Sequence, residues 1–180
     1  MPRRRLMMGM ICGGLLWPFV GTGTEAHAQA HSWLNQSAEI VGKARFSVFL
    51  FDVYDAALIS PDGRYDGTPP YALKLSYLRD VGRHRIVETS LDEMRRQGVT
   101  DTATLARWKN WMGEHFPDMR KGDEALMIAS TDGGMTVLYN GVQRGQIKDA
   151  AFTAAFMGIW LSDKAPRPAL SRALRGLKDN

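Results

Sequence analysis

The sequence predicts an α+β fold in which a large antiparallel sheet is covered by a layer of helices, and three observations predict it. Strand-like and helix-like segments come in blocks, in the order strands, two helices, strands, two helices, and not as alternating βαβ units. Short turns of the hairpin type, Asp132-Gly-Gly134 and Asn140-Gly141, join the later strands. No repeat and no long linker interrupts this order, so we expect one domain.

Ahead of this domain, residues 1–30 are typical of a secretory signal peptide. Three arginines at positions 3–5 precede an apolar run from Leu6 to Val20, which is too short to cross a bilayer. Cleavage after Ala28 or after Ala30 fits the small-x-small rule. We therefore expect residues 31–180 to form a periplasmic or secreted protein with no later membrane span.

The mature chain is nearly balanced in charge. Residues 1–30 contain three Arg and one Glu, so 23 basic and 19 acidic residues become 20 and 18, and the net charge falls from +4 to +2. The charges are interspersed, which argues against nucleic-acid binding. The single cysteine, Cys12, lies in the signal, so the mature protein has no disulfide, no Cys metal site and no cysteine nucleophile.

The first predicted strands lie between residues 45 and 78. Arg45–Ile59 is rich in Phe, Val, Leu and Tyr but is too long for one strand, so a turn or bulge is expected near Leu50–Asp52. After turns that contain Gly and Pro, Tyr71–Leu78 alternates apolar and polar residues as a half-buried antiparallel strand does.

Two helices are predicted next. His84–Gln97 carries apolar residues at helical spacing and stops at Gly98. A second helix begins near Thr100 or Asp101, whose side chains can cap it, and ends before Pro117.

The last elements are a hairpin, a strand and two further helices. Ala125–Ala129 and Met135–Tyr139 form the hairpin, and a short strand runs through Ile147. Asp149 caps the next helix, and Pro168 suits the first turn of the last one.

Five stretches of the chain carry a family signature when they are taken together. They are DVYDAAL at 52–58, LSYLRDV at 75–81, FPDMRKGD at 116–123, LYNGVQRGQI at 138–147 and FMGIWLS at 156–162. In this order, over residues 33–177, they resemble the bacterial exported branch of the chalcone isomerase-like family. The resemblance implies an open-faced β-sandwich with an apolar ligand cleft between sheet and helices, but not the isomerase reaction, because fold and activity separate readily.

Plant members of that family close a chalcone into a flavanone with an arginine, hydroxyl residues and a tyrosine-bound water. Arg45 is the counterpart of their arginine, and Tyr54 stands where they keep a threonine. The stretch Gly82–Thr89 contains neither their tyrosine nor their asparagine, and Phe156 stands near the place of a further threonine. These departures argue against chalcone isomerase activity and leave open whether the protein is an enzyme.

Non-catalytic, fatty-acid-binding relatives hold the carboxylate of their ligand with an arginine and a tyrosine, and Arg45 and Tyr54 resemble that pair. A guanidinium in an apolar cleft needs such a partner, since a carboxylate matches its fork of donors. A second interpretation pairs Arg45 with Asp52, Asp55 or a backbone carbonyl and makes Tyr54 a core aromatic. A strict period of two puts residues 45 and 54 on opposite faces, so the first interpretation requires an intervening turn or bulge.

Other polar residues give weaker signals. His84 and His115 lack a second ligand at metal-binding spacing, so we predict no metal and no cofactor. Asp118 and Asp123 are predicted to cap or turn the chain. Trp160 is predicted to pack under the sheet, with a place in the cleft as the alternative.

The sequence therefore predicts an exported protein that binds a small apolar or amphiphilic anion, such as a fatty acid, without turnover. Arg45 and Tyr54 are the predicted head-group contacts. One alternative is an isomerase or lyase acting on an enone or chalcone-like substrate, in which Arg45 polarises a carbonyl and Tyr54 shuttles a proton. Another is an envelope structural or assembly factor whose partner protein the sequence does not identify.

Overall fold

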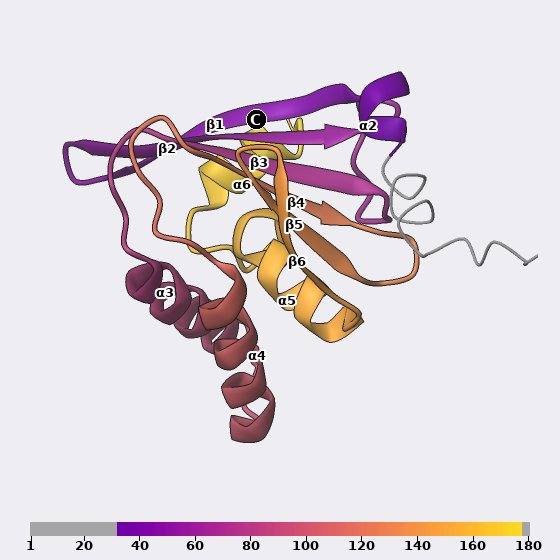
Figure 1. The fold of residues 1–180 in the computed structure, drawn as a ribbon. Helices are drawn as coiled ribbons and strands as arrows, with labels where there is room; N and C mark the ends of the chain where they lie inside the picture. Colours follow the sequence, from indigo (N-terminus) through magenta and orange to yellow (C-terminus); the bar gives the residue numbers. More distant parts are fainter. Residues whose placement is uncertain (1–31, 178–180) are drawn as a thin grey trace, which may run out of the picture.

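The computed structural model describes residues 32–177, in which six strands form one antiparallel sheet (Figure 1). Each strand pairs with the next one along the chain, so the order across the sheet is the order in the sequence. The predicted signal peptide, residues 1–30, lies outside the described residues. The strands are β1 (Glu39–Val48), β2 (Phe51–Ser60), β3 (Tyr71–Tyr77), β4 (Glu124–Ala129), β5 (Met135–Tyr139) and β6 (Val142–Ile147).

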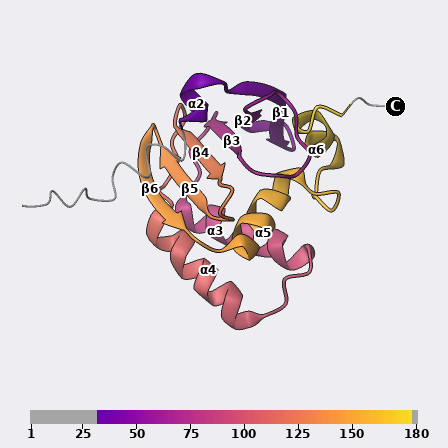
Figure 2. The same ribbon diagram turned by 90° about the vertical axis from the view of Figure 1, so that its right-hand side faces the viewer.

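The longer helices cover one face of this sheet (Figures 1 and 2). The opposite face carries the partly exposed Arg45 and Lys74 and is called the open face below. The crossing from β3 to β4 contains α3 (Arg83–Arg96) and α4 (Thr102–His115), while α5 (Ala150–Leu161) and α6 (Pro168–Leu174) follow β6. A short helix, α2 (Trp33–Gln36), precedes β1 and was not predicted. The predicted α+β class, with an antiparallel sheet under a helix layer, is confirmed.

Local sequence rules set most of the helix boundaries. The side chain of Asp101 accepts a hydrogen bond from the backbone N–H of Thr104, and Pro168 occupies the first turn of α6, as predicted.

Among residues 32–177, no helix combines the length and the apolarity that a membrane span requires.

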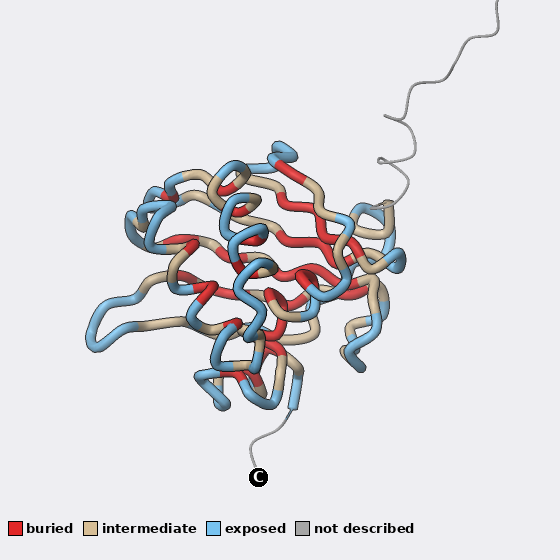
Figure 3. The backbone as a smooth tube through the Cα atoms, turned by 90° about the horizontal axis from the view of Figure 1, so that it is seen from below, coloured by how far each residue is buried: buried red, intermediate tan, exposed pale blue. Residues whose placement is uncertain are grey.

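The core joins the inner face of the sheet to α3, α4, α5 and α6 (Figure 3). Its largest fully buried side chains come from both layers and include Leu73, Trp108, Met135 and Phe152. Because residues 32–177 supply a shared core for every layer, we expect the chain from residue 31 onward to fold without residues 1–30.

Asp149 ties α4 to the start of α5. One of its carboxylate oxygens accepts the backbone N–H of Phe152 at 3.0 Å, and the other accepts the indole N–H of the buried Trp108 at 3.0 Å. Partial burial acts to raise the pKa of Asp149, but the hydrogen bond from Trp108 and those from the helix N-terminus hold this pKa below its ordinary value of 3.8.

We expect Asp149→Ala to lower the free energy of unfolding by about 2 kcal/mol, since it removes a cap and leaves a buried indole N–H without a partner. Asp101→Ala, which removes a cap alone, should cost about 1 kcal/mol. Urea denaturation at neutral pH measures both losses, and equal losses would contradict a contribution from Trp108. Because the folded-state pKa is lowered, the contribution of Asp149 is present above pH 3.8 and is lost as the pH falls through the folded-state pKa.

Candidate functional site

A cleft of about 540 Å³ lies between the helix-covered face of the sheet and the helices α3, α5 and α6. It extends to the turn between β1 and β2, where exposed residues line its mouth. Most of its wall is apolar, and the residues that form this apolar part include Phe46, Val53, Leu75, Val81, Ile86, Phe116, Met127, Val137, Phe156, Ile159 and Leu170.

Tyr54 supplies a hydroxyl group to this apolar wall. The residue is only 9% exposed, and its hydroxyl oxygen accepts the indole N–H of Trp160 at 2.9 Å. An indole can only donate, so the proton of Tyr54 must point toward some other acceptor. Within residues 32–177 no other group accepts this proton, so it can be donated to a ligand in the cleft.

The environment of Tyr54 keeps the hydroxyl group protonated at neutral pH. Burial raises the pKa of Tyr54 far above its ordinary value, while the bond from Trp160 and the charge of Arg167 oppose this change without reversing it. Tyr77, whose ring lies 5.6 Å from that of Tyr54, also has a raised pKa through burial and through its neighbour Tyr54. Both phenols are therefore neutral hydrogen-bonding groups.

Arg167 brings a cation to the mouth of the cleft. Its guanidinium carbon lies 4.7 Å from the ring centroid of Phe46, and Phe46 in turn stacks on Tyr54 with the ring centroids 4.8 Å apart. Arg167 is the residue immediately before the first residue of α6, so the chain between α5 and α6 brings this charge to the strands β1 and β2. The three side chains form a continuous layer that ends in a positive charge.

Charge in the cleft favours an anionic guest. Two further arginines, Arg79 and Arg85, line it together with the acids Asp80 and Glu93. Both acids have partners already, since Asp80 accepts the backbone N–H of Lys121 and Glu93 pairs with Arg96. The cationic groups therefore outnumber the acidic ones, and the acidic ones are engaged elsewhere.

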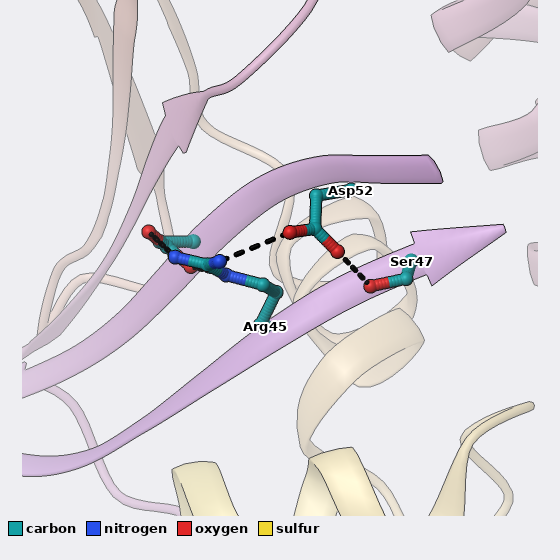
Figure 4. A network of polar contacts seen from close by, with 4 residues as sticks. Arg45, Ser47 and Asp52 are labelled. Atoms are coloured by element: carbon teal, nitrogen blue, oxygen red, sulfur yellow. Dashed lines mark hydrogen bonds and ion pairs between the residues drawn. The ribbon is translucent and has the colours of Figure 1, made fainter. Parts of the chain in front are cut away.

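Arg45 does not face this cleft, contrary to our expectation. It lies on the open face of the sheet, with its side chain 53% exposed, and bonds to both carboxylate oxygens of Asp55 at 2.6 and 2.9 Å. A further bond of 3.0 Å reaches Asp52, which also accepts the hydroxyl of Ser47 (Figure 4). The two acids, Asp55 foremost, raise the pKa of Arg45, and the bond from Ser47 together with that from Arg45 lowers the pKa of Asp52.

The register of the hairpin explains this correction. Arg45 pairs with Asp55 across the two strands, and Phe46 pairs with Tyr54. Residues directly opposite each other in an antiparallel pair share a face, so Arg45 and Tyr54 point to opposite faces. A bulge does follow Phe46, but it lies on the turn side of both residues and cannot bring them together. The alternative interpretation, in which Arg45 pairs with Asp52 and Asp55, describes the observed contacts.

The remaining polar candidates make local contacts in the structure. Asp118 accepts the backbone N–H of Arg83 at the start of α3, as a cap does, and Asp123 accepts the hydroxyl of Tyr139 in a turn. His115 stacks on Trp111 and bonds to its carbonyl oxygen. Within residues 32–177, no group of three or more His, Cys, Asp or Glu side chains could hold a metal ion.

Two contacts of the cleft were not predicted. Trp160 is buried under the sheet and also lines the cleft, so it combines the predicted place with the alternative one. Its bond to Tyr54 joins residues 106 positions apart, which no local pattern indicates. Arg167 belongs to no periodic pattern or motif in the sequence. Its position before Pro168, which marks the start of α6, is the one sequence feature that could have drawn attention to it. The contacts of Trp160 and Arg167 with the cleft can be recognised only once the helix layer is packed on the sheet.

Comparison with known proteins gives three consistent matches. A family profile described as chalcone isomerase-like matches residues 26–176. An uncharacterised protein of Haemophilus influenzae is 30% identical over 137 residues, which is 76% of this chain and 67% of that protein. The crystal structure of a fatty-acid-binding protein of Arabidopsis thaliana superposes with a TM-score of 0.61 at 11% identity, over 78% of this chain and 88% of that one. At this identity the structural match speaks for the fold alone.

Proposed function

This chain belongs to the chalcone isomerase-like family, and we propose that it binds a fatty acid or a similar amphiphilic anion without turning it over. The observation that carries the proposal is an apolar cleft whose wall contains two polar groups linked through the ring of Phe46, the neutral hydroxyl of Tyr54 and the cation of Arg167. The name of the Arabidopsis relative supports the same class of ligand.

The cleft suits a guest with an apolar tail. Its volume of about 540 Å³ falls in the range of small-molecule sites, roughly 300 to 1,000 Å³. Burying an acyl chain against these walls is favourable by about 0.8 kcal/mol for each methylene group removed from water. Longer chains should therefore bind more tightly until the cleft is full.

The head group of the guest must accept hydrogen bonds. Trp160 fills an acceptor position on Tyr54 and leaves its proton to be donated, and Arg167 can only donate. A carboxylate satisfies both groups, and a charge-assisted bond to it contributes about 1.5 to 3 kcal/mol. An alcohol or an ester would satisfy them less well because it carries no charge.

Binding fits the observed groups better than proton transfer does. A general acid or base works best with a pKa near the working pH, and burial moves the pKa of Tyr54 away from neutrality. Asp80 and Glu93 are already engaged with other groups. An isomerase or lyase in which Tyr54 shuttles a proton is the alternative, and turnover of enones that is lost in Tyr54→Phe would establish it instead.

Export to the periplasm or out of the cell is part of the proposal. Its support is the pattern of residues 1–30, namely the arginines at positions 3–5, the apolar run and the small residues up to Ala30.

The test is a titration of delipidated protein, residues 31–180, with palmitate and with methyl palmitate. We expect palmitate to bind more tightly, Arg167→Gln to weaken palmitate binding about tenfold, and Tyr54→Phe to weaken it about fivefold. Arg45→Gln is the matched control, since it removes the same charge from the opposite face, and it should change the affinity less than about twofold.

Isothermal titration calorimetry measures these affinities. Equal affinities in the wild type, Arg167→Gln and Tyr54→Phe would remove the head-group role from this place in the cleft. A stronger effect of Arg45→Gln than of Arg167→Gln would move the site to the other face of the sheet.

A further inference from the structure

The turn between β1 and β2 is an apolar tip that projects from the fold. Phe49 and Leu50 form the turn and are 95% and 96% exposed, and Phe51 is 62% exposed. Figure 1 shows this hairpin reaching beyond the helix layer at the left. Single exposed apolar residues are common, but three consecutive ones at the end of a projecting hairpin indicate an interaction site.

The backbone of this tip is held in a conformation that its sequence does not favour. Phe49 has a φ of 53°, in the left-handed region where glycine and asparagine are the usual residues. The turn between β5 and β6 shows the favourable choice, since Asn140 and Gly141 occupy the positive-φ positions there. A bulky aromatic ring in such a place costs stability, so its exposure requires another reason.

The hairpin is braced below its tip. Arg45 on β1 bonds to Asp55 and Asp52 on β2, and Ser47 bonds to Asp52. These contacts cross the two strands on the open face, just before the turn, and they stabilise the extended hairpin. Arg45 therefore positions the tip instead of binding a guest in the cleft.

A cation lies against the base of the tip. The guanidinium of Arg79 lies over the ring of Phe51, 5.1 Å from its centroid. Arg79 belongs to the loop after β3, which meets the loop after α4 at a bridge between Val81 and Met119. Exposed cationic residues of these two loops and of the first turn of α3 are Arg79, Arg83, Arg85, Arg120 and Lys121.

The acidic side chains of these two loops accept hydrogen bonds from backbone N–H groups nearby. Asp80 accepts the backbone N–H of Lys121, Asp118 accepts that of Arg83, and Asp123 accepts that of Arg120. In the two loops and the first turn of α3, five cations stand against three acids, and on the hairpin itself Arg45 stands against Asp52 and Asp55, so the sum remains positive by one charge. This surface therefore complements a negatively charged one.

We infer that the tip docks on the surface of an anionic phospholipid bilayer, with Phe49 and Leu50 among the acyl chains and the neighbouring arginines on the phosphates. A specific protein partner normally requires about 800 Å² of matched surface on each side, which a two-residue turn does not offer. A bilayer requires only a few apolar side chains with cations at the level of the head groups, because it adapts to their shape.

The tip lies next to the cleft, so docking on a bilayer could serve the exchange of a ligand. Val48, Phe49 and Phe51 also line the cleft, so docking would place the mouth of the cleft against the acyl chains. An amphiphile could then pass between bilayer and cleft without crossing water. This use rests on the proposed function, whereas docking itself does not.

The test is co-flotation of ligand-free protein, residues 31–180, with vesicles of phosphatidylcholine alone or with a quarter of phosphatidylglycerol. We expect the wild type to float with the anionic vesicles and to be released by high salt. Leu50→Asp should weaken this binding at least about tenfold, because it removes an inserting side chain and adds a like charge. Ile40→Asp is the matched control on the same strand pair, since Ile40 is 53% exposed at the far end of β1, and it should bind as the wild type does.

Leu50 does not line the cleft, so vesicle-free palmitate titration of Leu50→Asp separates the two proposals. Unchanged palmitate affinity with lost flotation supports docking. The inference is overturned if the wild type stays with the unbound protein, if Leu50→Asp floats equally well, or if neutral and anionic vesicles bind alike. The inference is also overturned if sedimentation shows that Leu50→Asp converts a dimer into a monomer while flotation stays unchanged.

Discussion

Replacing Ala125 with tryptophan should reduce palmitate affinity at least about a hundredfold, because the ring would occupy the cleft and exclude the acyl chain. Ala125 lines the cleft from β4, where it pairs with Leu75 on one side and Tyr139 on the other. Residues opposite each other share a face, so a side chain at this position points toward the helices. The ring would enter existing space, so the loss of affinity should come without a loss of stability.

Leu126→Trp provides the matched control for this change. Leu126 is the next residue on β4 and pairs with Lys74, so it points to the open face. The control should keep palmitate affinity within about twofold of the wild type, because it adds the same ring outside the cleft. Titration calorimetry measures the affinity and thermal unfolding the stability. Tight palmitate binding by Ala125→Trp would mean that the ligand lies elsewhere.

Replacing Gly42 with alanine should lower the free energy of unfolding by roughly 2 to 4 kcal/mol. A methyl group at this place on β1 would overlap the carbonyl oxygen of Ala173 and lie 2.5 Å from that of Leu174. Both clashes are with backbone at the end of α6, so no side-chain rotation can relieve them. The helix would have to move away from the sheet, and Arg167 at its other end would move with it.

Gly113→Ala tests the same substitution where there is room. Gly113 lies inside α4, and an added methyl group would meet nothing within 4 Å. Alanine is the better helix former, so this change should raise the free energy of unfolding by about 0.5 to 1 kcal/mol. Urea denaturation of both variants measures the two shifts, and a loss of less than 1 kcal/mol in Gly42→Ala would show that α6 is not closely docked on β1.

Residues whose effect is confined to one turn of chain were predictable. Asp101, Asp149 and Pro168 begin their helices as predicted, since a cap acts on backbone groups a few residues away. The turn at Asn140 and Gly141 follows from the same kind of local preference. The short helix α2 was missed because four residues are too few to show a period.

The candidate site was only partly predictable. Tyr54 and the apolar cleft came from the family resemblance, and the structure places Tyr54 in the cleft wall. Arg45 was assigned to the same wall, although its alternating position argued for the other face, and its contacts with Asp52 and Asp55 place it there. Arg167, the cleft cation that lies over Phe46, is far along the chain in a connection between helices.

By itself, the sequence determined the class of fold, the ends of most helices and the alternation of faces along each strand, because each depends on neighbours within a few residues. Only the tertiary structure decided which cation meets the cleft, which donor orients Tyr54 and where the hairpin tip lies. These contacts join segments up to 106 residues apart, and their geometry depends on how the helix layer docks on the sheet. Side-chain packing between the layers fixes that docking, and no periodicity along the chain encodes it.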